Sequence, residues 1–133
     1  MRTGQCQCGA ICYESKGEPC SIYICHCKEC QRQSASAFGI SLDVPQTGFR
    51  VTQGTPNYWS RTADSGKTLK CAFCPSCGSR LWHETQFNSA TLSIKAGSLD
   101  EPLDVSNAIH VWVKRKLPGI IIPADAKQFL EED

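Results

Sequence analysis

Three tight cysteine groups constrain this chain more than any other feature of its sequence. Seven of the ten cysteines form the groups Cys6-x-Cys8-Gly9, Cys25-His26-Cys27-x-x-Cys30 and Cys74-Pro-Ser-Cys77-Gly78. A disulfide across so short a spacing strains the Cα separation and the torsion that S–S bonds prefer. Two thiolates on one tight turn can instead converge on a metal ion about 2.3 Å from each sulfur. The three groups therefore indicate metal binding.

The N-terminal sequence and the charge balance narrow the class of protein. The first residues, Met1-Arg-Thr-Gly-Gln, lack the apolar run of a secretory signal, so we expect a cytoplasmic protein whose cysteines stay reduced. The longest clean apolar run, residues 120–122, is far shorter than a membrane span of about 20 residues. The formal charge of +1 gives no basic field for nucleic acid or an anionic membrane, and the sequence leaves the oligomeric state open.

The pattern along the chain predicts one mainly β domain over residues 1–133. A chain of this length is about one ordinary domain. Short segments rich in Val, Ile, Thr and aromatic residues, separated by turn formers, are typical of antiparallel strands. We expect strands at residues 10–13, 37–42, 49–52, 68–73, 90–96 and 108–113, and one helical turn at residues 28–34.

Ligand counting suggests two metal sites of different kinds. A structural zinc takes four protein ligands, whereas a catalytic zinc takes three and keeps one position open. The two pairs Cys6/Cys8 and Cys74/Cys77 make a natural closed site, and Cys25, Cys27 and Cys30 offer three sulfurs from one turn. Spacing alone leaves this partition open. One alternative is an iron–sulfur cluster on Cys71-x-x-Cys74-x-x-Cys77.

The motifs in their order resemble the glutathione-dependent formaldehyde-activating enzyme family, which includes centromere-protein-V-type domains. The resemblance is carried by Gly4-Gln-Cys-Gln-Cys-Gly-Ala-Ile-Cys-Tyr13, Cys25-His-Cys-Lys-Glu-Cys-Gln-Arg32, Phe73-Cys-Pro-Ser-Cys-Gly-Ser79, Ala96-Gly-Ser-Leu-Asp-Glu-Pro102, His110-Val-Trp-Val113 and Lys116-Leu-Pro118. It implies a single-domain, zinc-stabilised antiparallel β fold known as a β-tent. Two zinc ions per chain are expected, one structural and one catalytic.

The resemblance also implies roles for individual residues. Cys6, Cys8, Cys74 and Cys77 match the structural zinc ligands, and Cys25, Cys27 and Cys30 match the catalytic ones. Two positions depart from the family pattern. Ala35 stands where a glycine is common, which affects the loop beside the catalytic group, and Gly119 stands where a tryptophan is common, which affects substrate size or identity.

The implied activity is that of a carbon–sulfur lyase of the S-(hydroxymethyl)glutathione synthase type. A centre with three thiolates suits a substrate that is itself a thiol, such as glutathione or one of its adducts. Lys28 and Arg32, four residues apart on the predicted helical turn, are candidates for holding the glutathione carboxylates, although a solvated helix face is the plainer interpretation. A non-catalytic, zinc-stabilised binding module is the alternative function.

Several other residues have a structural interpretation beside a functional one. His26 lies between two ligands and is expected to point away from the metal, and His110, in an apolar strand, reads as a hydrogen-bonded core histidine rather than a base. Trp59 and Trp82 are expected in the core, although both could wall a pocket. Cys12 and Cys71 are most simply interpreted as buried small hydrophobes, and Cys20 has no assigned role, a surface thiol being one interpretation.

Overall fold

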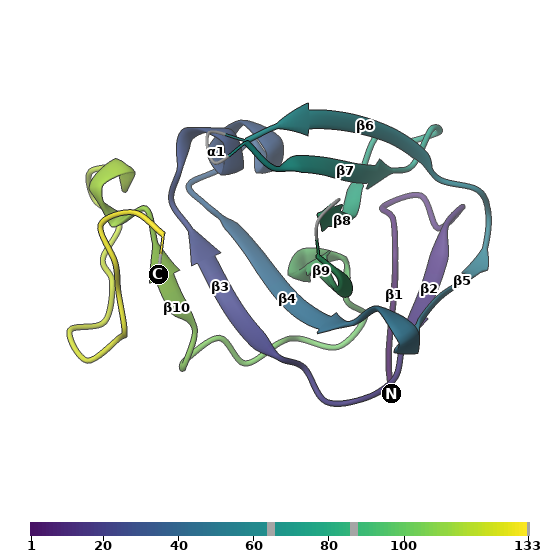
Figure 1. Ribbon diagram of the computed structural model, residues 1–133, viewed down its shortest axis with the longest axis horizontal. Helices are drawn as coiled ribbons and strands as arrows, with labels where there is room; N and C mark the ends of the chain where they lie inside the picture. Colours follow the sequence, from purple (N-terminus) through teal and green to yellow (C-terminus); the bar gives the residue numbers. More distant parts are fainter. Residues whose placement is uncertain (64–65, 86–87, 133) are drawn as a thin grey trace.

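A computed structural model describes residues 1–63, 66–85 and 88–132 of the chain (Figure 1). These residues form ten strands, one α-helix and three short 3-10 helices. The elements are β1 (Arg2–Gln5), β2 (Cys12–Ser15), β3 (Ser21–Cys25), α1 (Lys28–Ser34), β4 (Gly39–Pro45), β5 (Phe49–Gln53), β6 (Asn57–Thr62), β7 (Thr68–Phe73), β8 (Arg80–Thr85), β9 (Asn88–Lys95) and β10 (Ile109–Val111), with 3-10 turns at Gln46–Gly48, Ala96–Ser98 and Val113–Arg115. None of the described helices is long and apolar enough to cross a membrane.

The strands form two sheets. The smaller sheet has the order β1-β2-β5 and the larger the order β10-β3-β4-β9-β8-β7-β6. Figure 1 shows the smaller sheet standing across the concave side of the larger one. The expected mainly β, antiparallel architecture is confirmed, with one exception. Strand β10 pairs with β3 in parallel, because the chain crosses from one end of the sheet to the other before it adds this strand.

The apolar core lies between the two sheets. Trp82 is 1% exposed, and its ring packs edge-on against Phe49 at 4.8 Å and Tyr13 at 6.1 Å between ring centroids. Large aromatic rings bury much apolar surface and favour such edge-to-face contacts. The residues of this buried cluster are Cys6, Ile11, Tyr13, Leu42, Val44, Ala72, Cys74, Leu81, Trp82, Leu92 and Ile94. Two cysteines of the first and third groups therefore anchor the edge of the core.

The C-terminal segment lies along the free edge of β10, as Figure 1 shows at the left. His110 donates its backbone N–H to the Lys127 carbonyl at 2.9 Å and accepts one from Phe129 at 2.9 Å. The Trp112 N–H bonds to the Glu131 carbonyl at 2.9 Å. Residues after β10 thus satisfy backbone groups that the edge strand would otherwise leave unpaired.

The predicted elements agree with the structure in part. The helix at 28–34 and the strand at 68–73 are confirmed with their bounds. The strand expected at 10–13 begins later, at Cys12, because residues 6–11 form the first cysteine turn. The strands expected at 37–42, 49–52, 90–96 and 108–113 are present with shifted bounds. Strands β1, β3, β6 and β8 are additions to the sequence prediction.

Candidate metal centres and the adjoining cavity

Two short turns bring the first and third cysteine groups together. Cys6 directly follows β1 and Cys74 directly follows β7, and the sulfurs of Cys6, Cys8, Cys74 and Cys77 all lie within 4.8 Å of one another. The Cys6–Cys8 and Cys8–Cys74 sulfur distances are both 3.7 Å. A tetrahedral ion with bonds of about 2.3 Å places its sulfurs about 3.8 Å apart. The spacing of these four sulfurs therefore fits a zinc ion.

Hydrogen bonds to the sulfurs suit thiolates at this first metal group. The backbone N–H of Ile11 donates to Cys6 Sγ at 3.3 Å, and that of Ser76 donates to Cys74 Sγ at 3.3 Å. The Ser79 hydroxyl lies 3.2 Å from Cys77 Sγ, and this contact, followed by the Ser79 backbone N–H, lowers the pKa of Cys77 to about 5. Donors around the sulfurs stabilise their charged form, as ligands of a metal ion require.

The second cysteine group is built by the junction of β3 and α1. Cys25 ends β3, Cys27 is the N-cap of α1 and accepts the Cys30 backbone N–H at 3.3 Å, and Cys30 lies in the first helical turn. The three sulfurs lie within 4.8 Å of one another. Hydrogen bonds from the Cys25 and Cys30 thiols lower the pKa of Cys27 to about 2. A lowered thiol pKa favours the thiolate form that a metal ligand requires.

The second group offers three ligands. In residues 1–63, 66–85 and 88–132, no fourth His, Cys, Asp or Glu atom joins it. His26, between two of the cysteines, is fully buried and contacts His110, with 3.0 Å between His26 Nε2 and His110 Nδ1. The His26 backbone N–H also bonds to the Val111 carbonyl at 3.0 Å. His26 therefore faces β10, and His110 is a buried hydrogen-bonded histidine, as the sequence indicated.

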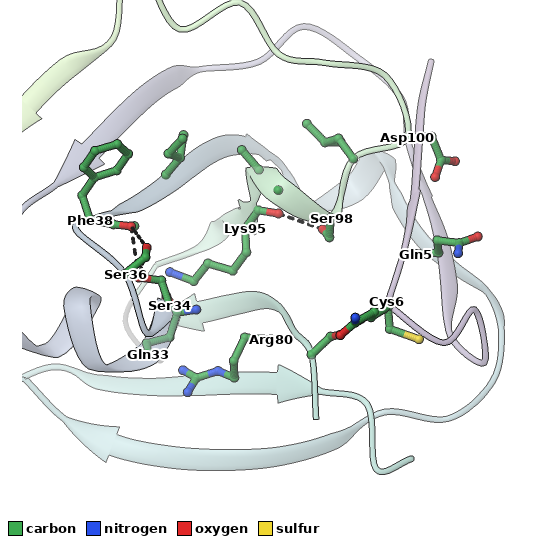
Figure 2. Close-up of a pocket in the computed structure, with 17 residues that line it drawn as sticks. Gln5, Cys6, Gln33, Ser34, Ser36, Phe38, Arg80, Lys95, Ser98 and Asp100 are labelled. Carbon is green, nitrogen blue, oxygen red and sulfur yellow. Dashed lines mark hydrogen bonds between the residues drawn. The ribbon is translucent and has the colours of Figure 1, made fainter. Parts of the chain in front are cut away.

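A cavity of about 670 Å³ adjoins the second group (Figure 2). Gly39 in its wall lies against Cys30, because a Cβ built on this glycine would stand 3.7 Å from Cys30 Sγ. The lining residues are Gln5, Cys6, Gln7, Gln33, Ser34, Ser36, Phe38, Gly39, Ile40, Ser79, Arg80, Lys95, Ala96, Gly97, Ser98, Leu99 and Asp100. A space of this size accommodates a small-molecule ligand. Cys6 of the first group lines it, whereas Cys25, Cys27 and Cys30 do not, and the second group approaches it through Gly39.

Strand register places Cys25 and Lys95 on one face of the large sheet. Directly opposed residues in neighbouring strands share a face, and side chains alternate along each strand. Cys25 lies opposite Gly39, and Lys95 lies opposite Ser41, two positions along the same strand. Burial lowers the pKa of Lys95, while the nearby Cys30 sulfur acts to raise it. Lys95 therefore lies on the same sheet face as Cys25, with strand β4 between them.

A β-bulge brings Arg80 to the same face. Arg80 lies opposite Phe73 and His83 lies opposite Cys71, so Arg80 and His83 share a face although three positions separate them. The register shift between β7 and β8 makes this possible, because an uninterrupted strand would turn residues three apart to opposite faces. The pairing of β8 with β9 puts His83 on the face of Lys95. Figure 2 shows the Arg80 and Lys95 side chains both reaching towards Gln33.

The predicted substrate cations Lys28 and Arg32 lie elsewhere. Both are exposed on α1, neither lines the cavity, and Arg32 pairs with Glu29 at 3.3 Å. Lys95 and Arg80 line the cavity instead. Sequence reasoning missed them, although a lysine at the end of the apolar strand pattern Leu-Ser-Ile-Lys was a usable signal.

The structure also shows where the other cysteines and the tryptophans discussed in the sequence analysis lie. Cys71 is 1% exposed in β7 and joins neither metal group of the described residues, so the structure gives no support to an iron–sulfur cluster on Cys71, Cys74 and Cys77. Cys12 is half-buried and donates to the Gly9 carbonyl at 3.6 Å, and Cys20 is exposed. The expectation for the tryptophans holds for Trp82 and is wrong for Trp59, which is 52% exposed on the edge strand β6.

The fold and the site together define a small, mainly β domain with two cysteine groups able to hold metal ions and a cavity beside one of them. The sequence profile of the glutathione-dependent formaldehyde-activating enzyme matches residues 1–115, and the chain belongs to this family. No curated protein matches the chain. Among solved structures, a Rhodobacter sphaeroides protein from structural genomics has a similar fold, with a TM-score of 0.62 and 23% identity over 82% of this chain and 99% of that one.

Proposed function

We propose that the protein is a zinc-dependent carbon–sulfur lyase that acts on glutathione and its adducts, as an S-(hydroxymethyl)glutathione synthase does. The observation that carries this proposal is a three-sulfur group, with no fourth ligand in the described part of the chain, that adjoins a cavity of small-molecule size. Family membership supports the substrate class. No disulfide joins any of the ten cysteines, all of which the structure describes, and this leaves them available as metal ligands.

The two groups would hold two zinc ions with different tasks. Cys6, Cys8, Cys74 and Cys77 would bind a structural zinc, and Cys25, Cys27 and Cys30 a catalytic one with an open position. When bound at the second group, zinc supplies a Lewis acid that keeps an incoming sulfur deprotonated and nucleophilic. Four ligands leave no such position at the first group, so its contribution is to stability.

The proposed reaction joins a thiol to an aldehyde. The glutathione sulfur loses its proton and attacks the formaldehyde carbon, a C–S bond forms, and the carbonyl electron pair moves to the oxygen, which takes up a proton to give the hydroxymethyl thioether. The reverse direction breaks the same C–S bond. Gly39 in the cavity wall lies beside Cys30 and Phe38 lines the same cavity, so this wall would position the two reactants and limit access of water.

A metal and activity assay with two cysteine variants tests the proposal. Zinc-loaded protein is expected to accelerate the exchange between free formaldehyde and the hydroxymethyl adduct of glutathione, measured by NMR with ¹³C-formaldehyde. Cys27→Ser should abolish the acceleration and lower the zinc content from two ions per chain to one. Cys20→Ser, which alters an exposed thiol outside both groups, serves as the matched control and should retain both.

Two outcomes would contradict this function. Full activity in Cys27→Ser would remove the second group from the reaction. A second zinc that is bound by four protein ligands, in a protein without activity towards glutathione and formaldehyde, would favour the alternative of a non-catalytic binding module. X-ray absorption at the zinc edge, with and without glutathione, distinguishes three sulfur ligands from four.

A further inference from the structure

Two cations in the cavity have no acidic partner. Among the residues that the structure describes, Arg80 and Lys95 form no ion pair, and Arg80 Nε is buried without a hydrogen-bond acceptor. The acidic lining residue, Asp100, accepts the Thr3 hydroxyl at 2.7 Å. The Arg80 guanidinium carbon lies over the exposed Trp59 ring, 5.8 Å from its centroid. The cavity is therefore a concave, positively charged space.

Two cations that face one cavity lower the stability of the fold unless an anion binds between them. Taking a charged group out of water is unfavourable without an opposite charge, and two like charges that face one cavity repel each other. Folded proteins usually place an acidic side chain beside such a pair. Here no Asp or Glu of the described residues forms an ion pair with Arg80 or Lys95, and Arg80 Nε is buried without an acceptor; the sulfur of Cys30 acts on Lys95 alone. The fold thus leaves the two charges for a partner that comes from outside.

We propose that Arg80 and Lys95 form a carboxylate-binding subsite that selects anionic thiols. The proposal rests on the proposed function in one respect, namely that the sulfur of the ligand lies at Cys25, Cys27 and Cys30. The guanidinium fork can hold a carboxylate through two hydrogen bonds, and the ammonium adds a point charge. The shared sheet face of Cys25, Lys95 and Arg80 puts the anion subsite and the sulfur group on one surface.

A third polar group narrows the ligand class. Gln33, on α1, lines the same cavity, and its side-chain oxygen is buried without a partner. An amide oxygen accepts from an N–H group. A ligand that offers a carboxylate to Arg80 and Lys95 and an N–H to Gln33 is a thiol built on an amino acid or a short peptide. Simple alkyl thiols offer neither group and would be poor ligands.

A structural role for the two cations is the competing explanation. Lys95 lies near the Cys30 sulfur, so it could serve to balance the thiolates rather than to bind a ligand. That role predicts a change in metal content when the charge is removed. The ligand-binding role predicts unchanged metal content and a selective loss of affinity for carboxylated ligands. Measuring metal content and ligand affinity in the same set of variants therefore distinguishes the two explanations.

The test is calorimetric titration of zinc-loaded protein with three probes. Glutathione carries the thiol and both carboxylates, S-methylglutathione keeps the carboxylates without a thiol, and cysteamine keeps the thiol without a carboxylate. We expect Arg80→Met and Lys95→Met each to weaken glutathione and S-methylglutathione at least tenfold, with cysteamine binding and zinc content unchanged. Arg80→Lys, which keeps the charge but loses the fork, should fall between. Lys28→Met, at an exposed cation outside the cavity, is the matched control and should equal wild type.

The outcomes separate this proposal from the function it rests on. Unchanged glutathione affinity in both Met variants, or a loss of zinc from them, overturns the carboxylate subsite. If the subsite is right and the proposed function is wrong, S-methylglutathione binds in an Arg80-dependent way while Cys27→Ser leaves glutathione affinity and turnover unchanged. If the function is right and the subsite is wrong, Cys27→Ser abolishes activity and the Met variants bind all three probes normally. Circular dichroism of each variant confirms that it is folded.

Discussion

Ala35 shows how a single residue closes the helix that carries the second metal group. It adopts a left-handed backbone with φ 52°, and its N–H caps the end of α1 by bonding to the Arg32 carbonyl at 3.3 Å. A residue with a Cβ pays about 1–2 kcal/mol for this conformation. The resemblance to the family implies glycine at this position, and alanine here adopts a backbone conformation that glycine adopts without strain. Alanine is therefore expected to cost stability here relative to glycine.

His83 is predicted to remain neutral across the physiological pH range. Burial, with the charges of Lys95 and Arg80, lowers its pKa to about 3 from the 6.5 of a free imidazole. Because the unfolded chain binds this proton at a higher pH than the folded one, His83 contributes stability above pH 6.5, and that stability is lost as the pH falls towards 3. NMR should show no titration of the His83 ring protons between pH 8 and pH 5.

A stability series gives the control for this prediction. The free energy of unfolding of His83→Gln, measured by urea at pH 7 and pH 5, should fall less than that of wild type over the same interval. The difference comes to at most about 1.4 kcal/mol per pH unit, the value for one proton. An inflection of the His83 signal near pH 6.5 would show that the ring is more solvated than the structure indicates.

At the scale of elements, the sequence predicts those helices and strands whose bounds are set by residues close together in the chain. Helix α1 is predictable with its bounds because Cys27 caps it and the chain turns at Ala35. Strand β6 has no such signal, since it is an edge strand with nearly every side chain exposed, and its sequence lacks an apolar alternation. Strand β8 carries a bulge that interrupts its period of two. The parallel pairing of β10 depends on the crossing of the whole chain, which no local pattern encodes.

The same distinction between local and long-range determinants applies to the residues of the candidate site. Cysteine spacing within a turn is a local property, so the sequence sufficed to group the ligands. The cations of the cavity depend on the register of β4, β8 and β9 and on one bulge, so Lys28 and Arg32 looked the better candidates in the sequence although they face solvent. Pairwise register is settled by the packing of the core, which involves residues far apart in the chain.

The core position of β8 leads to a prediction about its tryptophan. Trp82 is 1% exposed between the sheets, so Trp82→Ala should lower the free energy of unfolding by about 3–5 kcal/mol through lost burial and a cavity. Trp59→Ala, at a side chain that is 52% exposed on the edge strand β6, should cost less than about 1 kcal/mol. Urea unfolding of both variants, monitored by circular dichroism, measures the contrast. Equal losses would mean that Trp59 is buried in solution.

At the scale of the molecule, the first metal group ties the two sheets together. Cys8 and Cys74 are 66 residues apart in the chain, and a cross-link that closes a long loop constrains the unfolded chain more than one that closes a short loop. Cys25, Cys27 and Cys30 lie within one turn. Loss of the first group is therefore expected to cost far more stability than loss of the second.

Thermal unfolding of Cys74→Ser and Cys27→Ser tests this difference. A long-loop cross-link is worth about 2–4 kcal/mol, so Cys74→Ser should lower the Tm by about 10 °C or more. Cys27→Ser should shift it by a few degrees at most, on the order of 1 kcal/mol or less. Elemental analysis of both variants should give one zinc per chain. Similar Tm values for the two variants would show that the first group does not stabilise the fold more than the second.

The segment that lies along β10 also bears on how the molecule behaves at high concentration. An open strand edge is a template on which a second chain can add a strand, and covering that edge removes the template. Here the backbone bonds of His110 and Trp112 to residues 127–131 take up that edge. These covering residues lie beyond the matched range 1–115. Protection against edge-to-edge aggregation is thus supplied by a part of the chain outside the portion that defines its family.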